Sequence, residues 1–340
     1  MSIYLTHTTA LAYWLTRLMD AVLPAKITAR LPQAVFDRTL GDAGYGSDAV
    51  RRAREFMVAC GAWLHEEAAN RTVHLAVPLQ EQRRAGKAVA YHCMCGMAPE
   101  GAFCKVAEDV YVASPPYCFL QLAAMGLEIY ELVEAGTELC AAYGVQPCGQ
   151  GFAGRRVPLC DVASIDHFLD GVPGRRGTAR AREALQWVTE NSFSPMETSL
   201  LVELRLPMRL GGRGFPGFMS NAPVQVDDPE LRKLIGGKRF VRGDIVLAGL
   251  MAVIEYDSYE EHMDRWEFDQ TQTRANVLRA LGYTVISLTY GQVAELERFD
   301  TTVWAIEEQL GLVHPQLTRH ELCLQREVHD FLLAGDRSRF

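Results

Sequence analysis

The sequence lacks an excess of basic residues. It has 34 Lys and Arg against 42 Asp and Glu, a net charge of −8. A broadly basic surface of the histone or ribosomal type is therefore excluded. Any contact with nucleic acid must use a local basic patch, or metal ions that offset acidic groups.

Long apolar runs and a basic leader are also missing. The longest uncharged run, residues 110–127, contains Pro115 and Pro116. It therefore predicts a capped, buried helix rather than a membrane span. The N-terminus has no basic region of the secretory kind. We expect a cytoplasmic protein that has no membrane partner.

No C-x-x-C pair occurs among the nine cysteines, which gives no support to a zinc ribbon or a thioredoxin-like redox motif. The segment His92-Cys93-Met94-Cys95, with Cys104 beyond it, leaves a weak alternative of a metal site. The simpler interpretation is buried thiols in a reducing compartment. The remaining histidines considered have no spacing that predicts a shared metal: His7, His65, His74 and His167, together with His92.

The length of 340 residues predicts about two domains, and 49% hydrophobic residues are enough for a sizeable core. Glycine and arginine concentrate in residues 149–182, a composition typical of a linker. A basic strip that faces phosphates is the alternative. We therefore predict an α+β domain at 1–148, a linker at 149–182, an α/β domain at 183–299 and C-terminal helices at 300–340.

The third of these regions has the clearest pattern. Apolar runs predict strands at 244–247, 250–257 and 283–288, and a helix at 264–281 that Gly282 ends. A second helix begins near Ser194. The order predicts a mixed sheet flanked by helices, and thus an α/β fold.

Acidic residues stand at the ends of these strands. Asp244 opens one strand, and Glu255 and Asp257 close the next. Residues two apart on a strand face the same way, so the carboxylates are expected to gather. Burying an unpaired carboxylate costs about several kcal/mol. Protonation, a basic partner or a divalent cation would remove this cost. Mg²⁺ prefers such oxygen ligands, and Mn²⁺ is the alternative.

These motifs resemble the DUF559 group of the PD-(D/E)XK nuclease superfamily, close to the very-short-patch-repair endonucleases. The resemblance covers residues 190–292. It rests on these segments, in order: Ser194-Pro195-Met196-Glu197-Thr198, Phe240-Val241-Arg242-Gly243-Asp244, Ile254-Glu255-Tyr256-Asp257-Ser258, His262, Asp269, Arg274, Leu278 and Gly282-Tyr283-Thr284-Val285-Ile286. It implies a restriction-endonuclease-like core preceded by a smaller α+β domain.

The resemblance also implies roles. Asp244 and Glu255 would ligate Mg²⁺, and Glu197 would complete the site. The lysine of many relatives is replaced by Asp257, which leaves Asp257 or His262 to position or deprotonate water. Two arginines are predicted to contact nucleic acid, DNA being favoured over RNA: Arg242 and Arg274. Ser258 replaces the usual glycine of the turn.

The first half resembles, more faintly, the AbiEi-type antitoxin proteins of bacterial abortive-infection systems. The resemblance rests on these segments: Thr6-His7-Thr8-Thr9-Ala10-Leu11, Val73-His74-Leu75-Ala76-Val77-Pro78, Tyr91-His92 and Val110-Tyr111-Val112-Ala113-Ser114-Pro115. Some such proteins carry a DUF559-like second domain. The resemblance implies a toxin partner as an alternative to a homo-oligomer.

Simpler explanations stay open for each residue. Ser194 and Glu197 match a helix capping box, and Asp244 is a common turn residue. Glu255, Asp257 and His262 would be ordinary on a solvated surface. The sequence thus predicts a Mg²⁺-dependent nuclease in bacterial defence or repair. The alternatives are a non-catalytic regulator or antitoxin of a type IV toxin–antitoxin system on the same scaffold, and a structural interaction protein.

Overall fold

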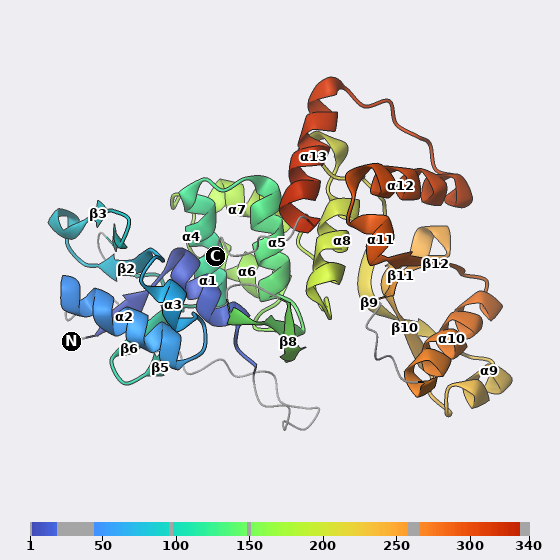
Figure 1. The fold of residues 1–340 in the computed structure, drawn as a ribbon, viewed down its shortest axis with the longest axis horizontal. Helices are drawn as coiled ribbons and strands as arrows, with labels where there is room; N and C mark the ends of the chain where they lie inside the picture. The colour runs from blue at the N-terminus through green and yellow to red at the C-terminus, as the bar shows by residue number, and fades with distance from the viewer. Residues whose placement is uncertain (1, 19–43, 95–97, 148–150, 258–264, 334–340) are drawn as a thin grey trace. The chain divides into compact units, whose positions relative to one another are not determined.

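The computed structural model describes residues 2–18, 44–94, 98–147, 151–257 and 265–333 (Figure 1). The chain divides into two compact units, Met1–Pro195 and Met196–Gly335. Both combine helices with strands, and the sheets mix parallel and antiparallel pairs, so the predicted α/β class is confirmed. None of the helices in these ranges is long and apolar enough to cross a bilayer.

The first unit contains a six-stranded mixed sheet in the order β3-β4-β2-β1-β6-β5. Its central pairs are β1–β6 and β2–β4, both parallel, and β1–β2, which is antiparallel. The bounds are β1 (Ile3–Leu5), β2 (Val73–Val77), β3 (Arg84–Ala85), β4 (Val89–Cys93), β5 (Phe103–Ala107) and β6 (Val110–Ala113).

Seven helices and a hairpin complete the described part of this unit. Ser114 stands just before two prolines, whose fixed φ suits a first helical turn, and a helix begins there as predicted. The bounds are α1 (His7–Leu15), α2 (Ser47–Ala59), α3 (His65–Ala68), α4 (Pro115–Met125), α5 (Ile129–Leu139), α6 (Val162–Asp170), α7 (Thr178–Leu185), β7 (Tyr143–Val145) and β8 (Phe152–Arg155), with a short 3₁₀ turn η1 (Gln80–Gln82).

The prediction of a linker at 149–182 is wrong. Its described residues form β8, α6 and α7, and both helices pack on α4. The first unit therefore extends to Pro195 and is the larger of the two. Arg156 shows why composition misled: its buried guanidinium donates to the carbonyl oxygens of Trp14 (2.6 Å) and Glu138 (2.8 Å). Burial lowers the pKa of Arg156 to about 10.

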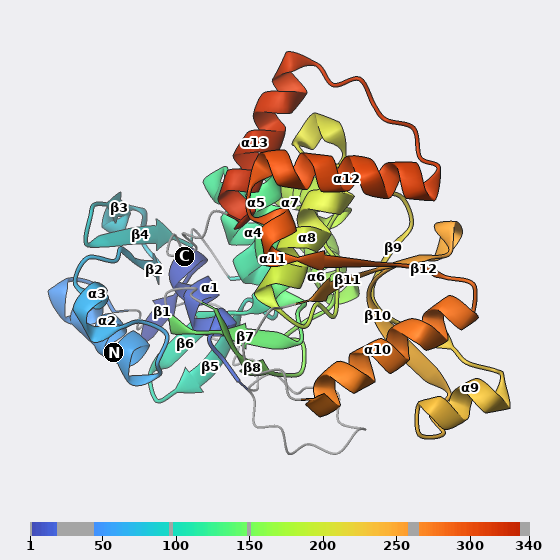
Figure 2. The ribbon, with the colours of Figure 1, turned by 45° about the vertical axis from the view of Figure 1, so that its right-hand side comes forward.

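The second unit is built on a four-stranded sheet in the order β12-β11-β10-β9. The strands β9, β10 and β11 are antiparallel neighbours, and β12 is parallel to β11. Figure 2 shows α10 on one side of this sheet and α11 and α12 on the other. The bounds are α8 (Pro195–Arg205), β9 (Phe218–Gln225), α9 (Pro229–Leu234), β10 (Phe240–Leu247), β11 (Ala252–Asp257), α10 (Arg265–Ala280), β12 (Thr284–Thr289), α11 (Tyr290–Val293), α12 (Leu296–Leu310) and α13 (Arg319–Leu333), with 3₁₀ turns η3 (Met208–Leu210) and η4 (Ala248–Leu250).

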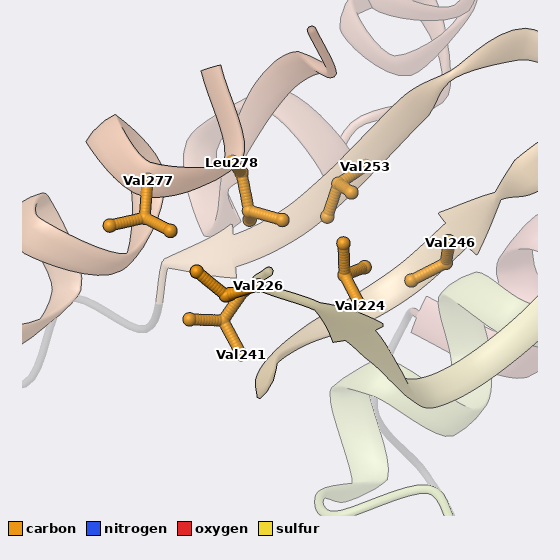
Figure 3. Close-up of a cluster of buried hydrophobic side chains, with 7 residues drawn as sticks. All are labelled: Val224, Val226, Val241, Val246, Val253, Val277 and Leu278. Atoms are coloured by element: carbon orange, nitrogen blue, oxygen red, sulfur yellow. The ribbon is translucent and has the colours of Figure 1, made fainter. Parts of the chain in front are cut away.

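Valines from three strands meet α10 in the core of this unit (Figure 3). The cluster consists of Val224 on β9, Val226 just after β9, Val241 and Val246 on β10, Val253 on β11, and Val277 and Leu278 on α10. The packing is close enough to require glycine at position 243, where an added Cβ would lie 2.5 Å from Cγ1 of Val253. Packing therefore explains the glycine that precedes Asp244, whatever the chemical role of the aspartate.

A buried ionic network ties the last two helices to α8. Arg213 contacts Glu203 on α8 (3.3 Å) and Asp300 on α12 (2.8 Å). His329 on α13 lies 3.1 Å from the same Glu203 oxygen. The described part of the predicted C-terminal segment 300–340 therefore belongs to the second unit, not to a separate appendage.

Candidate active site: a carboxylate row on the second sheet

The strand register gathers polar residues in a row across the second sheet. Ile245 pairs with Ile254, so the next step along β10 and β11 puts Asp244 opposite Glu255. The β9–β10 register passes from Gly243↔Ala222 to Ile245↔Ser220, which puts Asn221 beside Asp244. The row therefore runs through Asn221, Asp244 and Glu255, at the point where the apolar part of each central strand ends.

Glu255 is the most perturbed acid in the row. It is only 4% exposed, and its Oε2 accepts a hydrogen bond from Arg274 Nη2 at 2.6 Å. Its Oε1 is buried and has no hydrogen-bond partner among the described residues. Burial and then the charge of Asp244 raise the pKa of Glu255 to about 8, against the opposing effect of Arg274.

Asp244 and Asp257 flank this buried carboxyl. Asp244 Oδ2 accepts a hydrogen bond from the backbone N–H of Tyr256 at 2.9 Å, which holds its side chain toward β11. Asp257, two residues beyond Glu255 and half-buried, adds to the repulsion that raises the pKa of Glu255. The structure therefore brings together the three predicted carboxylates, but Asp244 does not open its strand as expected: β10 begins at Phe240.

Glu197 joins the row through an intermediary. It lies on α8, buried, and its Oε2 accepts a hydrogen bond from Asn221 Nδ2 at 2.9 Å. Among the described residues, Glu197, Asp244 and Glu255 do not bring three ligand atoms within 4.8 Å of one another. A cation held by Asp244 and Glu255 would thus have Glu197 behind Asn221, as a support rather than as a direct ligand.

The two predicted nucleic-acid contacts have different surroundings. Arg274 on α10 pairs with Glu255. Arg242 is exposed but donates from Nη1 to the backbone oxygen of Asn221 at 2.7 Å, and its guanidinium lies 5.4 Å from the ring centroid of Phe240. Asp269 is exposed on α10. His262 and Ser258 lie outside the described residues.

Sequence reasoning missed two features. Asn221 was not singled out because β9, with Pro223 inside it, gives no strand signal; as the outer strand of the sheet, β9 tolerates that proline. The second feature is in the first unit, where His7, His74 and His92 bring ligand atoms within 4.8 Å of one another. Their sequence spacing gives no hint of this, because the order of three neighbouring strands places them.

The donor set of the row fits a hard divalent cation. Two facing carboxylates supply oxygen ligands, and the unpartnered Oε1 of Glu255 is a buried acceptor that a cation would satisfy. A cation would also offset the repulsion from Asp244, which adds to the effect of burial in raising the pKa of Glu255. The arrangement is thus suited to binding a cation beside a phosphate group.

A scan against protein-family models, a search of curated proteins and a search of solved structures each find no match to this chain.

Glu255 makes the stability of the second unit depend on pH. Its pKa is about 8 when folded and 4.5 ordinarily, so between these values the folded state binds the extra proton. Stability then falls as pH rises from 4.5 to 8 and levels off above 8. In EDTA, we expect Glu255→Gln to remove this slope. Each pKa unit between the folded and unfolded states corresponds to roughly 1.4 kcal/mol at most, so the free energy of unfolding should change with pH by a few kcal/mol less in the variant than in the parent.

The measurement is urea unfolding at several pH values, with Glu230→Gln as the control because the Glu230 side chain is 76% exposed. Equal slopes for the two variants would mean that the Glu255 carboxyl is already ionised in the folded protein at neutral pH.

Proposed function

We propose that the second unit is a divalent-cation-dependent nuclease that hydrolyses nucleic-acid phosphodiesters. The observation that carries the proposal is the buried Glu255, which faces Asp244 and keeps one oxygen without a partner among the described residues. The order of the elements that bear the motifs, α8, β10, β11, α10 and β12, supports it. So does the resemblance to the DUF559 and PD-(D/E)XK nucleases.

In this proposal Asp244 and Glu255 hold the cation, Mg²⁺ or Mn²⁺. A cation held there would supply Lewis-acid chemistry, polarising the phosphodiester and lowering the pKa of the attacking water. Glu197 keeps Asn221 in place beside Asp244 through its hydrogen bond. Asp257, or His262 from the segment outside the described residues, accepts the proton of that water. Arg274, which pairs with Glu255 in this structure, would be available to a phosphate oxygen if a cation took its place at that carboxylate.

We propose DNA rather than RNA as the substrate, and the family resemblance is the basis for this choice. The setting that the resemblance suggests is bacterial defence or repair, in the cytoplasm. Arg242 would contact the backbone of the nucleic acid from the solvent side of the row, since its side chain is exposed.

One observation favours a second candidate, a non-catalytic regulator or antitoxin that binds a toxin partner or another copy of itself. The Arg274 guanidinium already supplies a positive charge at 2.6 Å from Glu255 Oε2. A permanent pair of this kind would replace the cation and leave the fold as a binding scaffold.

The test is cleavage of supercoiled plasmid and of single-stranded DNA by the full chain, with Mg²⁺, with Mn²⁺ and with EDTA. We expect cleavage that either cation supports and EDTA abolishes. Absence of cleavage, together with no uptake of Mn²⁺ by calorimetry, would overturn the nuclease proposal and favour the regulator.

A further inference from the structure

Three histidines from neighbouring strands form a cluster in the first unit. His7 begins α1 directly after β1, His74 lies on β2, and His92 lies on β4. In the parallel β2–β4 register, His74 is opposite Ala90 and Ala76 is opposite His92, so the two histidines share a face. In the order β4-β2-β1, the strand that carries His74 lies between the strand that carries His92 and the strand that precedes His7.

The imidazoles are in direct contact. His74 Nδ1 lies 2.9 Å from His92 Nε2, and the rings of His7 and His92 stack with centroids 3.6 Å apart. His7 is 7% exposed and His74 is 8% exposed. One ring nitrogen from each of the three lies within 4.8 Å of the other two. Three side chains that bind metals are therefore grouped where little water competes.

His7 is held in this place at a cost. Its φ is +50°, a region that residues other than glycine seldom adopt, and strain of this kind clusters at ligand sites. The backbone N–H of His7 donates to Gln121 Oε1 at 3.1 Å. Its Nδ1 is buried and has no hydrogen-bond partner among the described residues. A buried ring nitrogen without a partner is suited to a ligand.

The backbone around His74 is also fixed. Its N–H donates to Thr9 Oγ1 at 2.9 Å, and its carbonyl oxygen accepts from the N–H of Thr6 at 3.0 Å. Burial lowers the pKa of His74 to about 4 and, with the charge of His74, lowers the pKa of His92 to about 3.

The cluster opens on a cavity of about 480 Å³. His7 and His92 line it, and so do three arginines: Arg83, Arg175 and Arg176. The latter two come from the Gly/Arg-rich stretch, for which a basic strip facing phosphates is the alternative interpretation. An ion held by the histidines would be reached from this cavity, and the arginines would favour an anionic ligand there.

We propose that His7, His74 and His92 bind one transition-metal ion, with Zn²⁺ as the reference metal, and that the arginine-lined cavity beside it takes a phosphate-like anion. Three histidines with an open position are a common catalytic zinc set. To reach the Zn–N distance of about 2.0–2.1 Å, the stacked rings of His7 and His92 would have to turn, and the contact between His74 and His92 would have to open for the ion. The site is separate from the carboxylate row, which lies in the other unit and supplies only oxygen ligands.

The first experiment measures Zn²⁺ binding to the full chain, stripped with a chelator, by calorimetry and by metal analysis. We expect one Zn²⁺ per chain in a Glu255→Gln background, which leaves the histidine site intact. His92→Gln should weaken binding more than about 100-fold, because even the loss of a supporting residue costs about 10–100-fold. His74→Gln should do the same.

His65→Gln is the matched control, since His65 is exposed on α3 in the same unit. It should bind Zn²⁺ like the parent. Circular dichroism shows whether each variant is folded, and the visible absorption of bound Co²⁺ reports the histidine set directly. If the parent takes up no Zn²⁺, or if both folded variants bind it as the parent does, the proposal is overturned.

The second experiment uses inorganic phosphate as the probe. We expect phosphate to bind the zinc-loaded chain, and Arg176→Ala to weaken that binding about 10-fold, the loss of one hydrogen bond between charged groups. Zinc affinity should not change, since Arg176 is exposed. Equal phosphate binding by Arg176→Ala and the parent would contradict the anion part of the proposal.

Discussion

The double variant Asp244→Ala, Glu255→Ala is expected to lose cation-dependent cleavage by at least about 1000-fold. The two carboxylates face each other across β10 and β11, so removing both leaves no acid at the centre of the row to hold the cation. A bound cation contributes several kcal/mol to stabilising the transition state, and about 4 kcal/mol corresponds to 1000-fold. The measurement is the rate of plasmid nicking with Mg²⁺ or Mn²⁺.

The matched control is the double variant Asp227→Ala, Glu230→Ala, which removes two exposed acids of the same unit. It should cleave at the rate of the parent, and circular dichroism should show both variants folded. Cleavage by the Asp244→Ala, Glu255→Ala chain at the parent's rate would remove the row from the mechanism.

Arg213→Ala should destabilise the second unit by about 3–5 kcal/mol, because breaking a buried pair by removing one partner carries this cost. Its guanidinium contacts Glu203, Asp300 and the side chain of Gln325, and it lies over the ring of Phe299. Glu203 is fully buried, so the variant leaves a buried carboxylate that depends on His329 to offset its charge.

The comparison is Arg298→Ala on α12, where both side chains of the pair with Glu295 are at least 65% exposed. An exposed pair contributes at most about 1 kcal/mol. Urea unfolding, with hydrogen exchange of the α12 and α13 amides, separates the two cases. An Arg213→Ala chain no less stable than Arg298→Ala would mean that the network does not anchor these helices.

Local patterns predicted most of the second unit. The apolar runs near Glu255 and Leu288 became β11, a central strand, and β12, an outer strand. Gly282 follows the end of α10. Glu255 and Asp257 could be grouped in advance, because residues two apart on a strand share a face. The place of Asp244, inside β10 and opposite Glu255, depends on the strand register. Asn221 could not be predicted as part of the site, because β9 is an outer strand with a weak apolar pattern.

Other features depend on long-range topology. Glycine and arginine in residues 149–182 indicated a linker, but the buried Arg156 is satisfied by carbonyl oxygens that arrive from α1 and α5. His7, His74 and His92 are brought together by strand order, which no local spacing encodes. Contacts of this kind emerge only in the folded chain.

A crystal structure of the full chain grown with Mn²⁺, with anomalous data, tests the central claim most directly. We predict an anomalous peak between the carboxylates of Asp244 and Glu255, within bonding distance of Glu255 Oε1, with Arg274 moved away from the pair. Carboxylates that point apart, or an Arg274–Glu255 pair that persists with no peak at saturating Mn²⁺, would contradict it.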